Sequence, residues 1–214
     1  MNLIVIVNPN EPGIAKNVNH AAAACSKGWI HLLFYDDFLL DRYFYAHCFS
    51  ALGEGTPAWL VTSTQVFDQS HTGLQNASAP TFNDSIRLGV NSIGPPSAVI
   101  VRRDCWVDMS SRLSLFVDCG WYVSLKDTHG LPVICDSSLV ASTSWHGQTQ
   151  HDRGTWQIVR ELTCLLRQSA MPSKRLVRDT FLRLWEDGNV LLLLSLILVI
   201  SVRPGFRLGK SDGV

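Results

Sequence analysis

The feature that most constrains the fold of this chain is the alternation of short apolar runs with amphipathic or alanine-rich segments. The apolar runs have strand length and are bounded by turn residues, and most are followed by a segment with helical spacing. This alternation is typical of α/β domains, in which helices cover the faces of a mostly parallel sheet. The predicted strands are Leu3–Val7, Trp29–Phe34, Trp59–Val66, Ala98–Arg102 and Pro132–Cys135, and the predicted helices are Ile14–Ser26, Asp41–Leu52, Val117–Thr128, Thr155–Gln168 and Ser173–Trp185.

The overall charge limits the partners that we expect. The chain has 214 residues, of which 46% are hydrophobic and 17% are charged, and its formal net charge is zero. A chain of this length can bury one hydrophobic core. Because nucleic-acid binding needs a basic excess that neutralises phosphates, we expect no nucleic-acid partner.

The cysteines and the N-terminus both indicate a cytoplasmic protein. The six cysteines form no Cys-x-x-Cys pair and have no zinc-site spacing. This pattern favours reduced thiols in the core over a disulfide framework. The N-terminal apolar run is too short for a signal peptide and ends at Asn8 and Pro9.

Two adjacent carboxylates, Asp36 and Asp37, follow the apolar run Leu32–Tyr35. A strand that begins at Trp29 would present both at its C-terminal end, where open α/β sheets bind ligands. Hard oxygen ligands at such a position suit Mg²⁺ or Mn²⁺ held against a diphosphate. The alternative interpretation is a solvated turn, in which Asp41 caps the next helix.

A series of motifs surrounds this pair. Residues 13–37 contain four features in order. They are a glycine turn, an alanine-rich helix that opens with a basic residue and an asparagine, a strand, and the Asp-Asp pair. Further motifs follow in the order Ser92–Arg103, Phe116–Tyr122, Gly130–Ile134 and Trp145–Thr149. Together they resemble the family 2 glycosyltransferases of the GT-A fold, and the resemblance covers residues 3–168. It implies a Rossmann-like α/β fold with a mostly parallel sheet flanked by helices.

The front of the family pattern is absent from this chain. The chain opens with Met1–Pro9, which resembles the strand immediately before the turn at Gly13. The resemblance therefore implies an N-terminally truncated GT-A fold that lacks interior strands of the nucleotide-binding unit. We expect a partial glycosyltransferase-like domain over residues 1–170, followed by a C-terminal helix and apolar tail over residues 171–214.

The resemblance implies an activity and its main residues. An inverting, metal-dependent enzyme of this family moves a sugar from a nucleotide-diphosphate donor to a saccharide or lipid-linked acceptor, commonly in cell-surface polysaccharide synthesis. Asp118 matches the family's catalytic base, although a helix N-cap is the alternative for this residue. Asp37 would bind the divalent cation, Mn²⁺ or Mg²⁺, and Asp36 would assist through the water shell of the ion or the donor ribose.

Five further residues are candidates for the site, and three of them also have a purely structural interpretation. His146 is a candidate third metal ligand or diphosphate contact, or else a surface histidine in a loop. Lys16 and Asn17 match positions near the donor phosphates, where the family more often has Arg-Asn. Trp121 and Tyr122 could stack on a sugar or pack in the core.

The C-terminal apolar run and the activity itself leave alternatives open. Residues 190–202 are almost all Leu, Ile or Val, but a helix that spans a membrane needs roughly 20 apolar residues. A docked helix, a peripheral contact with the inner face of a membrane, and an out-of-frame or disordered tail all fit this run.

Two other functions are compatible with the sequence. The first is a catalytically incompetent glycosyltransferase fragment, which would act as a non-enzymatic binding module or have no function. The second is an unrelated hydrolase that uses Cys119 with His129 and Asp127. These three residues lie on one short segment, whereas catalytic Cys and His normally converge from distant parts of a chain.

Overall fold

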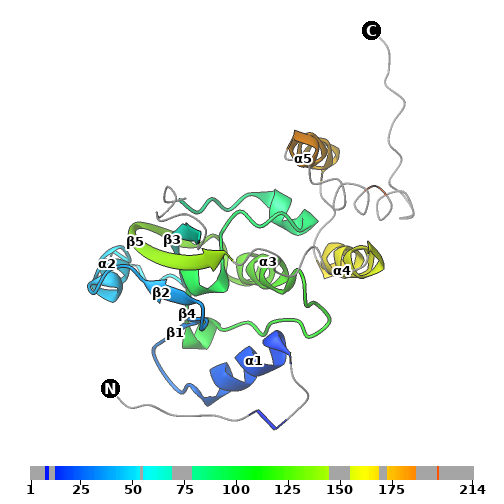
Figure 1. Cartoon of the computed structure of the whole chain (residues 1–214). Coiled ribbons are helices and arrows are strands. Elements are labelled where there is room, and N and C mark those ends of the chain that lie inside the picture. The colour runs from blue at the N-terminus through cyan, green and yellow to red at the C-terminus, as the bar shows by residue number, and fades with distance from the viewer. Residues whose placement is uncertain are drawn as a thin grey trace.

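The centre of the fold is a five-stranded mixed sheet with helices on both faces, as the computed structural model of the chain shows (Figure 1). The structure describes residues 8–9, 13–53, 55–68, 79–144, 155–168, 173–186 and 197. Three short 3-10 turns accompany the regular elements. In chain order the elements are α1 (Ile14–Ala24), β1 (Trp29–His31), β2 (Asp37–Leu39), α2 (Phe44–Ser50), β3 (Trp59–Asp68), η1 (Asp84–Leu88), η2 (Pro96–Ala98), β4 (Val99–Arg102), η3 (Arg103–Cys105), α3 (Val117–His129), β5 (Val133–Ser144), α4 (Thr155–Gln168) and α5 (Lys174–Glu186).

The strand order is β1-β4-β3-β5-β2, and the prediction of a mostly parallel sheet is wrong. Only β3 and β5 pair in parallel, while β1 with β4, β3 with β4, and β2 with β5 are antiparallel. Parallel pairing needs a crossover connection, which is usually a helix. No described helix joins β1 to β2 or β3 to β4, so these connections reverse the direction of the chain instead. The α/β class of the prediction is confirmed.

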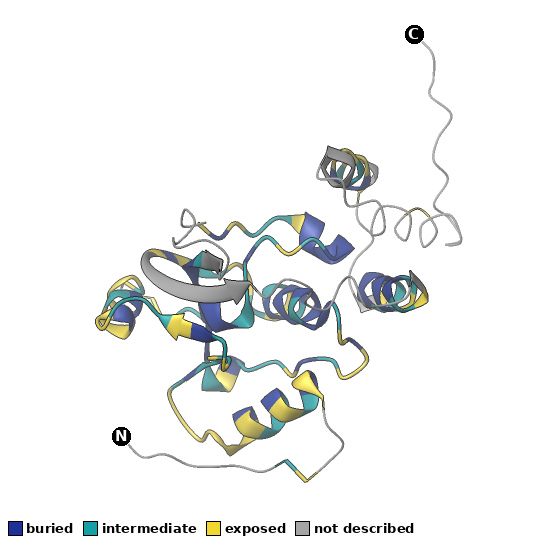
Figure 2. Ribbon diagram, in the orientation of Figure 1, coloured by how far each residue is buried: buried dark blue, intermediate teal, exposed yellow. Residues whose placement is uncertain are grey.

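Both faces of the sheet carry buried core residues, and strand β3 shows how the sequence divides them between the two faces. Trp59 and Val61 belong to the larger core cluster, which contains side chains of α1, α3, α4 and α5. Leu60, between them, belongs to a smaller cluster with Phe44 and Cys48 of α2. Successive strand residues point to opposite faces, so an uninterrupted apolar run serves both clusters. Buried residues accordingly line the sheet and the facing sides of the helices (Figure 2).

Most of the predicted elements are confirmed. Helix α4 has the predicted bounds, and α1, α3 and α5 differ from the prediction by one or two residues at an end. Helix α2 is shorter than predicted, strand β5 is longer, and β1 ends at His31 rather than Phe34. The three-residue strand β2 was not predicted. The predicted strand Leu3–Val7 lies outside the described residues, as does the apolar run 190–202 except for Ile197.

Two further observations concern the cysteines and the helices. All six cysteines are free thiols, and four of them, Cys48, Cys105, Cys119 and Cys135, are buried. Cys25 is exposed, so it is not a core thiol. Within the described part of the chain, no helix has the length and apolar character needed to cross a membrane.

Candidate active site

The candidate site lies at one edge of the sheet, which we call the site edge. Strands β1, β3 and β5 run in one direction and β2 and β4 in the other. The site edge therefore combines the C-terminal ends of the first three strands with the N-terminal ends of β2 and β4. Because β1 and β2 lie at opposite margins of the sheet, residues 32–36 have to cross this edge. Near the site edge, the apolar residues of β3 are followed by Thr62, Ser63 and Thr64, whose hydroxyl side chains are buried.

Asp36 and Asp37 lie where the crossing segment reaches β2. Asp36 is in a turn closed by a hydrogen bond of 3.1 Å from the backbone N–H of Asp37 to the carbonyl of Phe34. Asp37 begins β2, opposite Ser142 of β5, and is only 9% exposed. The prediction that both aspartates end the strand from Trp29 is therefore wrong, because β1 stops earlier. A fully solvated turn is also wrong, because Asp37 is buried.

Ser97 fixes the crossing segment to the start of β4. Its hydroxyl accepts a hydrogen bond of 3.1 Å from the backbone N–H of Phe34. Its carbonyl accepts one of 2.7 Å from Nε2 of His31, whose Nδ1 then accepts from the hydroxyl of Tyr45 at 3.0 Å. Burial lowers the pKa of His31, although the bond to Ser97 acts in the opposite direction. The neutral side chain of His31, the last residue of β1, thus ties the end of this strand to Ser97 at the site edge.

Asp118 lies in the first turn of α3 and has two hydrogen-bond donors. Its Oδ2 accepts from Nδ2 of Asn91 at 2.7 Å, and its Oδ1 accepts from the backbone N–H of Cys119 at 2.8 Å. Part of the residue is exposed, yet protein atoms closely surround the carboxylate, and this burial raises its pKa despite both bonds. The N-cap alternative is wrong because α3 already begins at Val117.

The carbonyl of Gly94 joins α3 to the segment before β4. It accepts hydrogen bonds from the Tyr122 hydroxyl at 3.0 Å and from Nδ2 of Asn91 at 2.8 Å. Gly94 has a φ of +112°, and a Cβ atom there would lie 3.1 Å from Cγ2 of Thr64. Only glycine fits both the backbone conformation and the close approach to β3.

Tyr122 connects the two carboxylates that the sequence analysis singled out. Its pKa is raised well above the usual value, first by burial and then by the negative charges of Asp118, Cys119 and Asp37. Both aspartates are therefore near enough to the same buried hydroxyl to act on it electrostatically. The fold thus brings the start of β2 and the start of α3 to one region of the site edge.

Glu161 of α4 fixes the backbone that leads into α3. Its carboxylate accepts hydrogen bonds from the backbone N–H groups of Ser114, Leu115 and Phe116 at 2.9, 2.7 and 3.3 Å. The Ser114 hydroxyl and the Gln157 amide donate to it as well, at 2.7 and 2.9 Å. Burial raises the pKa of Glu161, but these bonds outweigh it and leave the pKa below the usual value. Glu161 therefore positions α3, and with it Asp118.

The other predicted site residues lie on other elements or outside the described residues. Lys16 and Asn17 are in α1, where the side chain of Asn17 accepts a hydrogen bond of 2.7 Å from Nδ2 of Asn8. His146 lies outside the described residues. Trp121, at 1% exposed, packs in the core and is not available to stack on a sugar.

The donor set at the start of β2 fits a hard divalent cation. Asp36 and Asp37 supply carboxylate oxygens, and Mg²⁺ is commonly bound by one or two carboxylates together with substrate phosphates. Among the described residues, no group of three or more His, Cys, Asp or Glu side chains could hold an ion by itself. Any ion here would therefore need oxygens from a ligand as well.

Sequence reasoning missed Asn91, His31 and Ser97. Asn91 had a recognisable local signal, because its side chain accepts hydrogen bonds from the backbone N–H groups of Ile93 and Gly94, both at 3.0 Å. Asn side chains commonly accept a hydrogen bond from the backbone two residues further on, which forms an Asx turn. His31 and Ser97 had no local signal, because they meet only through the fold. No model of a known protein family and no curated protein matches the chain.

Proposed function

We propose that this protein is an inverting, metal-dependent glycosyltransferase of the GT-A type that transfers a sugar from a nucleotide-diphosphate donor to a saccharide or lipid-linked acceptor. One observation carries the proposal. Asp37 and Asp118 come from distant parts of the sequence, yet both lie near enough to the buried Tyr122 hydroxyl for their charges to add to the rise of its pKa, which burial mainly causes. The resemblance assigns these two residues to the metal and to the catalytic base, which have to act at one centre.

Asp118 is the base in this proposal. Burial raises its pKa, which makes the ionised carboxylate a stronger proton acceptor than an exposed aspartate. The acceptor hydroxyl gives its proton to Asp118 as its oxygen bonds to the anomeric carbon. The bond from that carbon to the donor diphosphate breaks on the opposite face, and the configuration inverts. Asn91, hydrogen-bonded to Oδ2 of Asp118, holds the carboxylate in place.

Asp37 and Asp36 are the cation ligands in this proposal. A bound Mg²⁺ or Mn²⁺ would supply positive charge that stabilises the departing diphosphate. Asp37 is fixed by its place in the β2–β5 pair, whereas Asp36 lies in the preceding turn. We expect Asp37 to provide the defined ligand and Asp36 to adjust to the ion or the ribose. A cytoplasmic location agrees with the six free thiols.

Calorimetry on the purified chain tests the proposal. UDP and other nucleoside diphosphates would be titrated with and without Mn²⁺ into the wild type, Asp37→Ala and Asp118→Asn. Asp179→Ala, which changes an exposed carboxylate on α5, is the matched control. We expect Mn²⁺-dependent binding that Asp37→Ala abolishes and that both other variants retain. A screen of labelled nucleotide sugars for transfer to saccharide and lipid acceptors would then follow.

Two outcomes would contradict the proposal in different ways. Mn²⁺-dependent binding without turnover of any donor would indicate the incompetent fragment, which acts as a binding module. Absence of nucleotide binding, or binding that Asp37→Ala does not change, would remove the basis for glycosyl transfer.

A further inference from the structure

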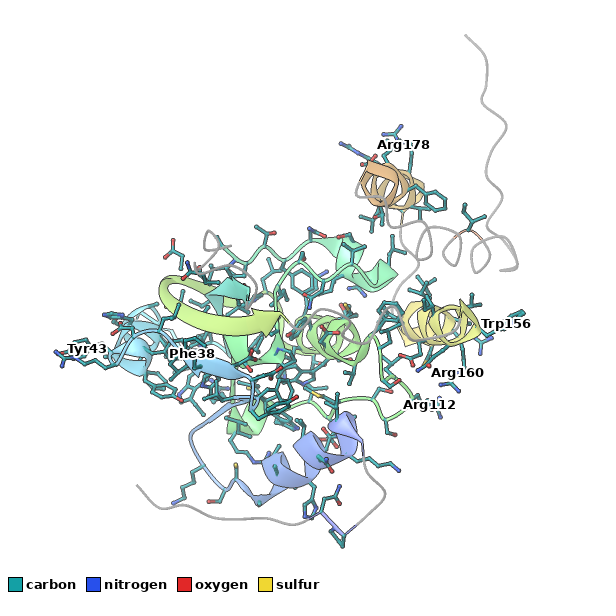
Figure 3. All side chains as sticks on the ribbon, viewed as in Figure 1. Phe38, Tyr43, Arg112, Trp156, Arg160 and Arg178 are labelled. Atoms are coloured by element: carbon teal, nitrogen blue, oxygen red, sulfur yellow. The ribbon has the colours of Figure 1, made fainter. Side chains whose placement is uncertain are left out.

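A second candidate site lies away from the site edge, in a pocket between α4 and the loop that precedes α3. Its volume is about 690 Å³. Arg112 and Arg160 lie close together below α4 (Figure 3). The residues that line the pocket are Ser111, Arg112, Arg160, Thr163, Cys164 and Arg167.

The spacing on α4 explains why its side chains meet there. Arg160, Thr163 and Arg167 are separated by three and four residues, so they lie on one face of the helix. The two arginines are two helical turns apart, about 10 Å along the axis. Arg112 approaches from the loop, and all three arginines are exposed. The pocket therefore presents guanidinium groups from two separate segments.

No described carboxylate neutralises these arginines. None of the three takes part in a salt bridge within the described ranges of the chain. Glu161, the neighbour of Arg160 in the sequence, is fully buried and is hydrogen-bonded to residues 114–116 and Gln157. By contrast, Arg87 pairs with Asp127, Arg102 with Asp104, and Arg178 with Asp179.

We propose that this arginine pocket binds a phosphate group. Guanidinium groups recognise phosphate oxygens through paired, charge-assisted hydrogen bonds. Convergent arginines without acidic partners repel one another, and a dianion between them would relieve that repulsion. The hydroxyl of Ser111, which also lines the pocket, is a further donor. The site is separate from the proposed diphosphate site and does not depend on the proposed function.

The pocket spans the same two segments that Glu161 connects. Arg112 belongs to the loop that leads to Ser114, and Arg160 and Arg167 belong to α4. A phosphate held by both segments would strengthen the attachment of the loop to α4. Binding should therefore stabilise the folded chain as well as occupy the pocket.

Two sources of phosphate are compatible with this chemistry, a free anion and a lipid headgroup. Trp156, which is 80% exposed, lies one turn before Arg160 on the same helix. Tryptophan is enriched at membrane–water interfaces, and basic residues on a helix are attracted to anionic lipids. The test therefore needs a soluble arm and a vesicle arm.

Binding measurements on the full chain test the proposal. Inorganic phosphate would be titrated at low ionic strength without divalent cations, with heteronuclear NMR shifts and the melting temperature as readouts. Vesicles of phosphatidylcholine, with and without phosphatidic acid, would be used for co-sedimentation. The variants are Arg160→Gln with Arg167→Gln, and Arg112→Gln. Arg178→Gln on α5 is the control for Arg112→Gln, because it makes the same single charge change at an exposed position outside the pocket.

We expect phosphate to shift the signals of the pocket residues and to raise the melting temperature. The double variant should weaken binding at least tenfold and Arg112→Gln severalfold, whereas Arg178→Gln should not change it. Arginine-dependent binding to phosphatidic acid vesicles, without binding of free phosphate, would also support the site and would assign a lipid headgroup to it. Absence of binding in both arms, or equal binding by the wild type and the double variant, would overturn the proposal.

Discussion

Two carboxylates on either side of the start of α3 have opposite environments. Glu161 has five hydrogen-bond donors, and its pKa is lowered below the usual value although burial acts against this. Asp118 has two donors, and burial raises its pKa. The fold therefore stabilises the charge of Glu161 and destabilises the charge of Asp118.

This difference separates a structural carboxylate from a chemically available one. Backbone N–H groups occupy Oε2 of Glu161, and the Ser114 hydroxyl and the Gln157 amide occupy Oε1. A substrate could therefore approach this carboxylate only by displacing these groups. Asp118 retains acceptor capacity, because a carboxylate has about four lone-pair sites. A carboxylate whose pKa is raised by burial is a candidate for a functional site. The comparison therefore favours Asp118 as the reactive residue and Glu161 as the residue that positions it.

The largest effect that we expect is the loss of activity in Asp118→Asn. Removal of a general base lowers the rate by about 10²- to 10⁴-fold. The folded state should not be destabilised, because the variant removes a buried charge that the fold disfavours. Steady-state transfer assays and urea unfolding measure the two effects. A variant with wild-type turnover would rule out Asp118 as the base.

Glu161→Ala should have the largest effect on stability. The substitution leaves the N–H groups of Ser114, Leu115 and Phe116 without their acceptor. Of the three, only Phe116 is buried, and water can reach the N–H group of the exposed Ser114. A buried, unsatisfied donor costs about 1–3 kcal/mol, so the free energy of unfolding should fall by about 1–3 kcal/mol. Asp179→Ala, an exposed carboxylate on α5, should change it by less than about 0.5 kcal/mol. Equal effects of the two variants in urea unfolding would contradict the positioning role of Glu161.

The pH dependence of stability should have opposite signs for the two residues. The pKa of Asp118 is raised in the folded state above its ordinary value of 3.8. The contribution of Asp118 to the free energy of unfolding is therefore largest at low pH and is lost as the pH rises from 3.8 through the pKa of the folded state. The pKa of Glu161 is lowered in the folded state below its ordinary value of 4.5. The contribution of Glu161 to the free energy of unfolding is therefore present above pH 4.5 and is lost as the pH falls through the pKa of the folded state.

Matched variants isolate these two contributions. Relative to the wild type, Asp118→Asn should gain stability as pH rises above 3.8. The deficit of Glu161→Gln should shrink as pH falls below 4.5. Urea unfolding at several pH values from about 3 to 7 measures both differences. Curves that run parallel to the wild type would contradict the assigned environments.

The smallest effect that we expect is that of Tyr122→Phe. The variant removes the hydrogen bond of the hydroxyl to the Gly94 carbonyl, which still accepts from Asn91. Because the carbonyl keeps one donor, the free energy of unfolding should fall by only about 1 kcal/mol. Tyr43→Phe, at an exposed tyrosine of the loop before α2, is the matched control and should have no effect. A loss of more than about 3 kcal/mol would mean that Tyr122 has a larger structural role than this bond.

The sequence was sufficient to predict the elements that local patterns determine. Helix α4 and strand β3 follow directly from their spacing and apolar runs, and α1, α3 and α5 differ only at their ends. Asp37 and Asp118 were selected by resemblance, and the fold brings both near Tyr122. Local patterns failed where pairing partners decide the structure. Strand β2 has three residues and exists because it pairs with β5, which is distant in the sequence.

The strand directions and the supporting contacts could not be predicted for the same reason. The alternation of strands and helices suggested parallel crossovers, but β4 reaches β3 through 3-10 turns and pairs antiparallel. Glu161 contacts Ser114 across 47 residues, and His31 contacts Ser97 across 66. Such contacts carry no local sequence signal, because each residue type is also common at exposed positions.

Paramagnetic broadening by Mn²⁺ tests the central claim, that Asp37 and Asp118 serve one centre. Amide NMR spectra would be recorded with UDP and substoichiometric Mn²⁺, for the wild type and for Asp37→Ala. We expect the amide signals of Asp37, Gly94 and Cys119 to broaden together in the wild type and not in the variant. The amide signals of α5 should remain sharp in both. Broadening at Asp37 without any at Cys119, or identical broadening in Asp37→Ala, would contradict the shared site.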